Sequence, residues 1–534
     1  MRWLRWSTWL VIGIWFVVCL LTLDYNGPFF DEAIYITGGQ RTLEGFGYSD
    51  GYLTWFAGSL LWPMVAYLGY SIAGLVGTRV VALLLATVAF AAVVKATENL
   101  FGTRAAFWTA LAFALNGPML ALARLGVYDV PALTGLAIAF WALTELARRD
   151  QRLWLALAAV AFMAGFFSKY PMGLMLLPLL GVLFFLRREK ALLDIGISGF
   201  ISLAILLVFL LPAREQIETL VTFQTTTKPT FGVTRGTILA GVLYAMVIPT
   251  LLALGGWFVA ILRPRPKTPT GPKAARPRSS TLGSTAATKR TPATIAGPAS
   301  GRMEAGNRWS LIGARWGLPT VLLLNLGLWP AYHIISGNPV SVNKHLVFSL
   351  ALAYPLVGLG LSVLWSGMQH TAGESGSPKL RLLPRLAVAV IVLLLAGYAA
   401  IQWNQANYAW PDTRPAADYL VAHVQPGETL LINESWPYTM ALYTQGRIAS
   451  PWDVYDLYRI THGEGPADIC SYDWVVDTQG SYAWPQDVRE TIERCGTYRP
   501  VSTTTSYVIA LGADWNYVRY PVQTIVWQRE GGAP

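Results

Sequence analysis

Residues 80–94 read VVALLLATVAFAAVV, fifteen consecutive residues without a charged side chain. With its flanks, a run of this kind approaches the roughly 20 residues that a membrane-spanning helix needs. Similar runs recur at 9–23, 321–332 and 386–401. The chain of 534 residues is 54% hydrophobic and only 13% charged, so a soluble fold would leave too much apolar surface in water. The sequence therefore predicts a polytopic α-helical membrane protein.

Basic residues between the apolar runs predict how the chain crosses the membrane, because Lys and Arg concentrate on the cytoplasmic side. About eleven spans put the N-terminus inside, the C-terminus outside, and the pairs Arg148/Arg149 and Arg187/Arg188 in the cytoplasm. If residues 53–76 crossed the membrane, both arginine pairs would lie on the outer side. We therefore interpret this segment as a helical hairpin or an amphipathic segment in the outer interface. We expect a multi-pass protein of the inner (plasma) membrane, with spans near 8–24, 79–97, 104–122, 131–147, 152–168, 171–187, 192–212, 236–262, 312–336, 346–366 and 384–402.

The net charge of +10 comes almost entirely from one stretch. Ten Lys or Arg residues and a single acidic residue, Glu304, lie between Arg263 and Arg308. The stretch is rich in Pro, Ser, Thr and Gly, which is typical of a disordered segment. We predict a disordered basic cytoplasmic loop over residues 263–310, close to anionic membrane lipid, and no nucleic-acid partner.

The composition changes after about residue 403, where polar residues increase and no further spanning segment follows. We therefore predict a transmembrane domain over residues 1–402 and a soluble extracytoplasmic domain over residues 403–534. Short periodic segments in the second domain indicate a small α/β sandwich. Its helices are expected at 415–424 and 487–494, and its strands at 429–432, 474–476 and 507–511.

The three cysteines are too few for a disulfide scaffold or a zinc site. Cys470 and Cys495 could pair if their domain lies outside the cytoplasm, with two free thiols as the alternative. Cys19 lies in the first apolar run and is expected to face lipid.

The strongest local signal is Phe30-Asp31-Glu32-Ala33-Ile34-Tyr35, which follows the first span on its outer side. Two adjacent carboxylates near a membrane surface repel each other and lose hydration, so a protein without a use for them has little reason to keep them there. Asp31 could instead cap a helix that runs through Thr37. The residues alone leave both interpretations open.

Further polar side chains are expected at the same outer face. Asp129 precedes the fourth span, and Lys169 lies in the short turn between two apolar spans. Lys344 and His345 precede the tenth span. Each has an ordinary explanation, as a helix cap or as an interfacial anchor. Their gathering at the outer ends of nearly uncharged helices nevertheless favours a site for an anionic lipid headgroup and for an acceptor that loses a proton.

This order of features resembles the GT-C superfamily of membrane glycosyltransferases. Within it, the pattern is similar to the protein O-mannosyltransferases, the lipid A aminoarabinose transferases and their bacterial relatives. The resemblance extends over roughly residues 28–190 and rests mostly on the segments 31–35 (DEAIY), 101–106 (FGTRAA) and 168–169 (SK). The later helices agree only in kind, and the C-terminal domain matches no named acceptor-binding module.

The resemblance implies a GT-C catalytic domain that transfers a sugar, with inversion, from a polyprenyl-phosphate donor to a glycan, lipid or protein acceptor outside the cytoplasm. Asp31 would be the base that activates the acceptor hydroxyl, Glu32 and Asp129 would support it, and Tyr35 would contact substrate. Because a carboxylate can take a proton from a hydroxyl, the chemistry of these residues agrees with the resemblance.

The resemblance also implies a role for basic residues at the donor phosphate. Lys169, together with Lys344 or His345, would stabilise the departing lipid phosphate, because fixed cations near a developing negative charge lower the barrier. No residues have the spacing of a dedicated metal site, so we expect no required cofactor and no bound metal, with a divalent ion held by Asp31 and Glu32 as the alternative.

A transporter or flippase of lipid-linked sugar intermediates is the main rival hypothesis. Such a protein also needs many helices and also binds phosphate, but its ionisable groups should lie near the middle of the membrane and on broken helices. Here they are expected at helix ends, which favours an enzyme. A sensor or scaffold with an exported domain would leave the carboxylates and lysines without a role.

Overall fold

The computed structural model describes residues 2–47, 59, 61–215, 218, 234–262, 308–337, 341–371, 378–461, 463–479, 486–511 and 517–531. The expected basic loop at 263–310 lies almost entirely outside the described residues. The same holds for residues 53–58, the first part of the expected interfacial segment.

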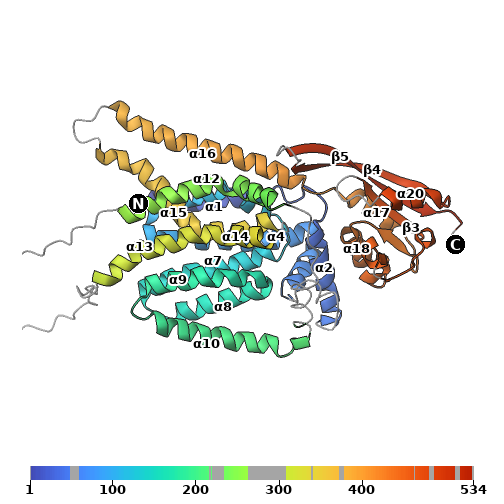
Figure 1. Cartoon of the computed structure of the whole chain (residues 1–534), viewed down its shortest axis with the longest axis horizontal. Helices are drawn as coiled ribbons and strands as arrows, with labels where there is room; N and C mark the ends of the chain where they lie inside the picture. The colour runs from blue at the N-terminus through green and yellow to red at the C-terminus, as the bar shows by residue number, and fades with distance from the viewer. Residues whose placement is uncertain are drawn as a thin grey trace, which may run out of the picture.

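Apolar helices form a bundle at one end of the molecule, and a mixed sheet with its own helices forms the other end (Figure 1). Among the described residues, eight helices are long and apolar enough to span a membrane, and two shorter apolar helices accompany them. The predicted polytopic α-helical fold is confirmed. The bundle contains α1 (Arg2–Leu20), α4 (Leu61–Phe101), α5 (Thr103–Ala114), α6 (Gly117–Leu122), α7 (Asp129–Arg149), α8 (Arg152–Ser168), η2 (Tyr170–Met175), α9 (Leu176–Leu186), α10 (Ala191–Leu210), α12 (Arg235–Leu262), α13 (Arg308–Leu324), η4 (Asn325–Gly327), α14 (Leu328–Ser336), α15 (Val342–Thr371) and α16 (Pro378–Asn407).

Helix α4 reverses direction near its start. Its backbone leaves helical values at Ala73 and Gly74, and the φ of Gly74 is +59°, which favours glycine. The hydroxyl of Thr78 donates a hydrogen bond to the carbonyl oxygen of Ala66 at 2.7 Å, whereas twelve residues of straight helix span about 18 Å. Residues 61–72 therefore fold back on the spanning part of α4, as a helical hairpin would.

The segment expected to span at 104–122 consists of two helices instead of one. α5 ends at Ala114, and the side chain of Asn116 caps α6 by accepting the backbone N–H of Met119 at 3.0 Å. Pro118 lies in the first turn of α6, where its missing N–H costs no helical hydrogen bond. The Asn-Gly-Pro sequence ends one helix and starts the next.

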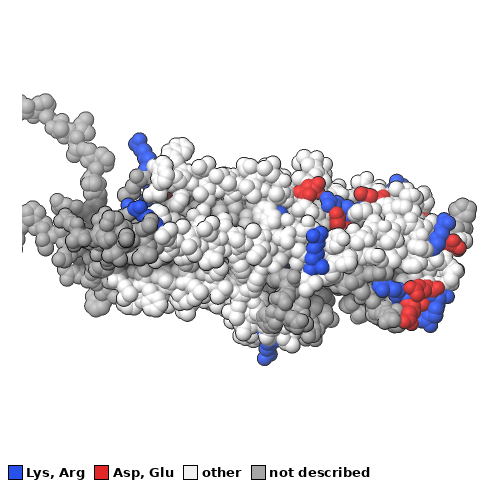
Figure 2. Space-filling model, turned by 90° about the horizontal axis from the view of Figure 1, so that it is seen from above, with Lys and Arg blue, Asp and Glu red and all other residues white. Residues whose placement is uncertain are grey.

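The surface of the bundle suits a lipid environment. Figure 2 shows a broad white surface over the helices, with charged side chains gathered mainly over the C-terminal domain. Leu192, Phe200 and Leu211 on or next to α10 are mostly exposed, as expected for a lipid-facing helix. The expectation for Cys19 was wrong, because its side chain is fully buried among the bundle helices beside Trp15 and not turned to lipid.

The C-terminal domain is built on a five-stranded sheet in the order β2-β1-β3-β5-β4. β1 pairs in parallel with β2 and β3, and β5 pairs antiparallel with β3 and β4. Side chains alternate across β1, so Leu430 and Ile432 pack with α17 and α18, whereas Leu431 packs with α20. The elements are α17 (Arg414–His423), β1 (Leu430–Ile432), α18 (Ser435–Thr444), η5 (Pro451–Asp453), β2 (Val454–Tyr455), α19 (Leu457–Thr461), η6 (Ile469–Ser471), β3 (Trp474–Gln479), α20 (Gln486–Arg494), β4 (Tyr498–Leu511) and β5 (Tyr517–Arg529).

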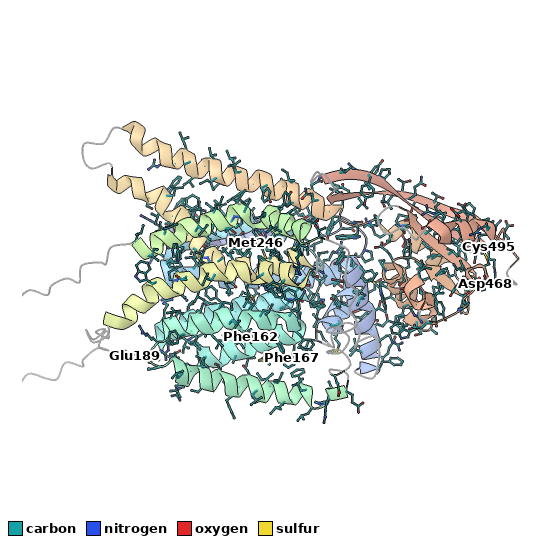
Figure 3. The ribbon with its side chains drawn as sticks, in the orientation of Figure 1. Phe162, Phe167, Glu189, Met246, Asp468 and Cys495 are labelled. Carbon is teal, nitrogen blue, oxygen red and sulfur yellow. A yellow bond between two sulfur atoms is a disulfide. The ribbon has the colours of Figure 1, made fainter. Side chains whose placement is uncertain are left out.

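The five elements predicted in this domain coincide with α17, β1, β3, α20 and part of β4, so the predicted small α/β fold is confirmed. The sequence interpretation did not include α18, β2 or β5. Cys470 and Cys495 form a disulfide, which decides between the two alternatives that the sequence left open. Figure 3 places Cys495 and Asp468 at the far end of this domain and Glu189 at the opposite end of the molecule.

Helix α2 (Phe30–Leu43) lies between the bundle and the C-terminal domain, across the end of the helices (Figure 1). α18 packs on α2. At this contact the hydroxyl of Tyr443 donates to the carboxylate of Glu44 and accepts a hydrogen bond from Arg41 at 3.3 Å. The helix that carries Asp31 and Glu32 is thus held from both sides.

Candidate active site

Asp31 and Lys344 form an ion pair between the start of α2 and the first turn of α15. Nζ of Lys344 lies 4.9 Å from the centre of the Phe29 ring, a distance at which a cation and an aromatic face attract. Both side chains keep some exposure, 25% for Asp31 and 14% for Lys344. A ligand can therefore reach this pair from outside the protein core.

Lys344 also lines a largely apolar groove of about 250 Å³. Residues of α6, α12, α15, α16 and β4 form its walls, among them Tyr244, Gln405, Trp410 and Ile509. Lys344 is the one charged side chain among the described residues that line the groove. A mostly apolar groove with a single cation suits an amphiphile that has a hydrocarbon chain and an anionic headgroup.

Asp129 and Lys169 form a second ion pair, deeper in the protein. Asp129 is the first residue of α7, and Lys169 lies between α8 and η2. Their side chains are only 0% and 2% exposed. Oδ2 of Asp129 has no hydrogen-bond partner among the described residues, and Nζ of Lys169 lies 4.6 Å from the centre of the Tyr128 ring.

The two ion pairs belong to one electrostatic cluster. Lys344 interacts with the charge of Asp129 as well as with Asp31, and Lys169 interacts with the charges of Asp31 and Lys344. The structure thus brings together four charged residues that the sequence placed on one face. Tyr35 belongs to the same cluster. Its buried ring centre lies 4.7 Å from that of Tyr128, and its hydroxyl interacts electrostatically with the carboxylates of Asp31 and Asp129.

Glu32 does not share the role of Asp31, although the two residues are adjacent. Its Oε1 accepts hydrogen bonds from the backbone N–H of Gly126 at 2.7 Å and from Nε of Arg79 at 2.9 Å. Its Oε2 accepts from the backbone N–H of Phe29 at 2.9 Å and from Nη2 of Arg79 at 2.8 Å. With four donors on a fully buried carboxylate, Glu32 fixes the position of α2 and has little capacity left to act as a base.

Arg79 is a site residue that sequence reasoning missed. Besides Glu32, its guanidinium donates to the carbonyl oxygens of Leu23 at 2.8 Å, Asn26 at 3.0 Å and Gly27 at 2.9 Å. Arg79 is fully buried, so these partners replace its lost hydration. The ion pair connects α4 with the α1–α2 loop and with Glu32 of α2, directly behind Asp31.

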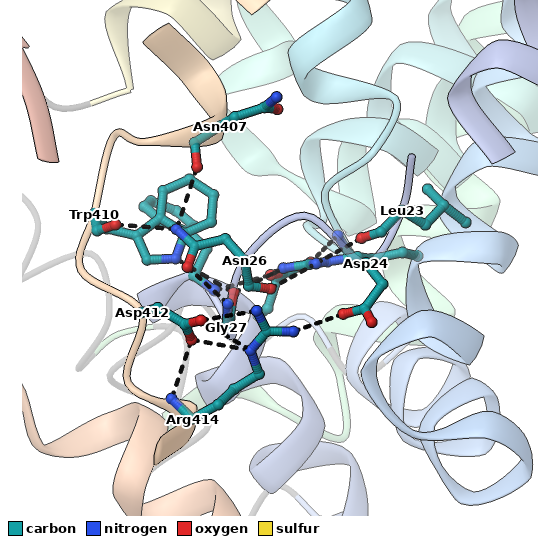
Figure 4. A network of polar contacts seen from close by, with 12 residues as sticks. Leu23, Asp24, Asn26, Gly27, Asn407, Trp410, Asp412 and Arg414 are labelled. Atoms are coloured by element: carbon teal, nitrogen blue, oxygen red, sulfur yellow. Dashed lines mark hydrogen bonds and ion pairs between the residues drawn. The ribbon is translucent and has the colours of Figure 1, made fainter. Parts of the chain in front are cut away.

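The α1–α2 loop is also tied to the segment that leads into the C-terminal domain (Figure 4). Nδ2 of Asn26 donates to the backbone oxygens of Asn407 and Trp410 at 3.4 and 3.0 Å. Nη1 of Arg414 donates to Asp24 at 2.7 Å. These contacts position the start of α2 relative to the end of α16, one wall of the groove.

Arg124 is a second buried cation that the sequence interpretation did not use. Its guanidinium lies 3.6 Å from the ring centre of Trp403 and 4.5 Å from that of Tyr25, and Nη2 donates to Asn407 at 2.7 Å. Among the described residues it has no carboxylate in an ion pair. Arg124 therefore adds positive charge next to Tyr25, a residue of the groove wall.

His345 contacts a different set of residues from its neighbour Lys344. Its Nδ1 lies 2.9 Å from Nε2 of His333 on α14, and its ring centre lies 4.2 Å from that of Trp329. His345 is buried and does not belong to the described lining of the groove. Its predicted contact with phosphate stays a prediction.

Within the described ranges, no three His, Cys, Asp or Glu side chains converge as a metal site would require. A second cavity, of about 410 Å³, lies between α7, α8, α9 and α10. The described residues that line it carry no charge. Lys344 lines the groove and pairs with Asp31, so the groove and not this larger cavity is the candidate site for a charged ligand.

Comparison with known proteins shows one family that part of this chain resembles. The family model described as dolichyl-phosphate-mannose-protein mannosyltransferase matches residues 59–213, a range that contains Arg79, Asp129 and Lys169. No curated protein matches the chain.

Two solved structures are similar over nearly the whole chain. One is ArnT from Cupriavidus metallidurans in the apo state, with 13% identity, 97% coverage of each chain and a TM-score of 0.56. The other is the same protein bound to undecaprenyl phosphate, with 13% identity, 98% coverage of each chain and a TM-score of 0.53. At this identity the likeness shows a common fold, and the family match adds a resemblance to membrane glycosyltransferases over residues 59–213.

Proposed function

We propose that this enzyme transfers a sugar, with inversion, from a polyprenyl-phosphate donor to a hydroxyl-bearing acceptor at the outer face of the membrane. The observation that carries the proposal is the Asp31–Lys344 pair at the wall of an apolar groove. It offers an anion-binding cation, a carboxylate and a path for a hydrocarbon chain in one place. A solved structure of similar fold contains undecaprenyl phosphate, which has this combination of headgroup and chain.

Each side chain of the cluster has a distinct role in this proposal. Lys344 binds the donor phosphate and stabilises the negative charge that grows on it as the glycosidic bond breaks. Asp31 takes the proton of the acceptor hydroxyl. Because the deeper pair of Asp129 and Lys169 is almost closed to solvent, it supports the cluster and does not form the first contact with the lipid.

The side of the membrane on which transfer takes place follows from the predicted topology. The site lies at the end of the bundle that carries the C-terminal domain, which we infer to be extracytoplasmic (Figure 1). A reporter fused after Pro534 should then be exported, and one inserted near Ser284 should stay in the cytoplasm. Both reporters on one side of the membrane would overturn this orientation.

Proteoliposomes that contain the purified enzyme and a radiolabelled polyprenyl-phosphate sugar test the function itself. The enzyme hypothesis expects the label to move to a cell-envelope acceptor and unlabelled polyprenyl phosphate to accumulate. The rival transporter hypothesis expects intact labelled lipid to move between leaflets without cleavage. Transport without transfer would reject our proposal. Asp31→Asn protein in the same liposomes is the control, because transfer should fall by about 100-fold or more while the bilayer stays unchanged.

A further inference from the structure

We propose that Lys344 exchanges partners during the reaction: it holds Asp31 in the empty site and releases it when the donor phosphate binds. Asp31 would then act as a base only after the donor has arrived. This inference rests on the proposed function and adds an order of events to it.

The geometry of the reaction requires the pair to open. In an inverting displacement, the attacking hydroxyl oxygen approaches the anomeric carbon to roughly 3 Å from the face opposite the leaving phosphate. The base must therefore lie on one side of the sugar and the phosphate-binding cation on the other. In the present structure Asp31 and Lys344 contact each other directly, which leaves no room for a sugar between them. The pair has to open before transfer can occur.

The surroundings of the pair allow both side chains to change partner. Asp31 is 25% exposed, so its carboxylate can regain water or bind an acceptor hydroxyl once Lys344 leaves it. Lys344 is always paired, first with a carboxylate and then with a phosphate, and the Phe29 ring stays within its reach. The pair of Asp129 and Lys169 lacks both properties, because it is sealed and does not line the groove.

The backbone beneath Asp31 is firmly held. Adjacent Glu32 is bound to Arg79 and to the N–H groups of Phe29 and Gly126. The exchange therefore needs only side-chain rotations of Asp31 and Lys344, with no movement of α2. A lysine in the first turn of a helix has the flexible four-carbon stem that such a change of partner requires.

The exchange gives a balanced sequence of steps. The phosphodiester of the donor pairs with Lys344, and Asp31 becomes a free carboxylate. The acceptor oxygen then forms its bond to the anomeric carbon while the bond from that carbon to the phosphate oxygen breaks. The acceptor proton moves to Asp31, and the polyprenyl phosphate leaves with one more negative charge beside Lys344. Donor must bind before acceptor in this scheme.

Chemical labelling of the full-length protein in nanodiscs tests the exchange. A water-soluble carbodiimide with glycine ethyl ester reports on Asp31, and an acetylating reagent reports on Lys344, both quantified by peptide mass spectrometry. We expect undecaprenyl phosphate to lower acetylation of Lys344 and to raise labelling of Asp31 severalfold, whereas undecaprenol, which has no phosphate, should change neither. Lys95, paired with Glu98 and 37% exposed, is the matched control whose acetylation should stay constant.

The outcomes separate the two proposals. Protection of Lys344 with unchanged or lower labelling of Asp31 would overturn the exchange and leave the phosphate site intact. No protection of Lys344 would instead overturn the phosphate site on which the proposed function depends. Lys344→Gln protein gives an independent check, because its Asp31 should be labelled strongly without lipid and should not respond to it; weak labelling of Asp31 there would also overturn the exchange.

Discussion

Asp31–Lys344 and Asp129–Lys169 are ion pairs of identical composition in contrasting surroundings. The first pair borders a groove and keeps partial exposure, whereas the side chains of the second are 0% and 2% exposed. Opening the partly solvated pair should cost less than opening the buried pair, which leaves a charge without compensation. Because the two pairs share their residue types and differ in their surroundings, we expect the first pair to take part in chemistry and the second to maintain the structure.

The sharpest way to test this difference is to neutralise the base. Asp31→Asn should lower the turnover number by about 100- to 10,000-fold, because it removes general-base catalysis. Folding should be nearly unaffected, since Glu32 and Arg79 still hold α2. Initial rates of sugar transfer and a thermal unfolding curve of the same preparation measure both effects. Full activity in this variant would exclude Asp31 as the base.

Removing the cation of the buried pair should mainly affect stability. Lys169→Ala leaves Asp129 buried and unpaired, which should lower the free energy of unfolding by about 3–5 kcal/mol. The double variant Asp129→Asn with Lys169→Met, which has no lone charge, should recover much of the loss. Thermal unfolding in matched lipid compares the three proteins. If Lys169→Ala is stable but has a raised donor KM, Lys169 binds the phosphate and the distinction between the pairs fails.

Removing the cation of the groove should mainly affect kinetics. Lys344→Ala should lower kcat/KM for the donor by roughly 30- to 1000-fold, equivalent to about 2–4 kcal/mol of lost phosphate stabilisation. Lys344→Arg should recover only part of it, because a planar guanidinium reaches differently from an ammonium. Donor-dependent initial rates are the measurement. Normal kinetics in Lys344→Ala protein would contradict the assignment of the groove.

Glu434 is a carboxylate that forms no ion pair among the residues that the structure describes, so it differs from both Asp31 and Asp129. Glu434, in the C-terminal domain, has a φ of +53°, and burial raises its pKa from 4.5 to about 8. The folded protein therefore binds a proton that the unfolded chain has lost, and stability should fall as the pH rises from about 4.5 to 8. The slope for one proton is at most about 1.4 kcal/mol per pH unit.

Thermal unfolding of wild-type and Glu434→Gln protein across this pH range measures the effect. The variant should lose less stability than the wild type between pH 5 and pH 8. Parallel curves for the two proteins would show that Glu434 does not titrate in this window.

Much of the cluster can be predicted from the sequence, because Asp31, Asp129, Lys169 and Lys344 each lie at an end of an apolar segment. Counting the spans places all four on one face. Their pairing cannot be predicted in the same way, since it depends on which helix ends touch. Asp31 and Lys344 are 313 residues apart, and no local pattern shows that they meet.

Other features depend on contacts that no sequence pattern predicts. Arg79 resembles a cation at the end of a span, and its partner Glu32 lies 47 residues earlier. The side of α1 on which Cys19 lies follows from packing against neighbouring helices, not from hydropathy. The break at Asn116, in contrast, has a local signal, because Asn-Gly-Pro is unfavourable within a helix.

A structure of the protein with undecaprenyl phosphate in nanodiscs would show directly whether Lys344 binds the donor phosphate. Our account predicts the phosphate within hydrogen-bonding distance of Nζ of Lys344, the chain in the groove beside Tyr244 and Trp410, and the pair of Asp129 and Lys169 unchanged. A phosphate bound to Lys169, or a lipid chain that fills the apolar cavity between α7 and α10 while the groove stays empty, would contradict it.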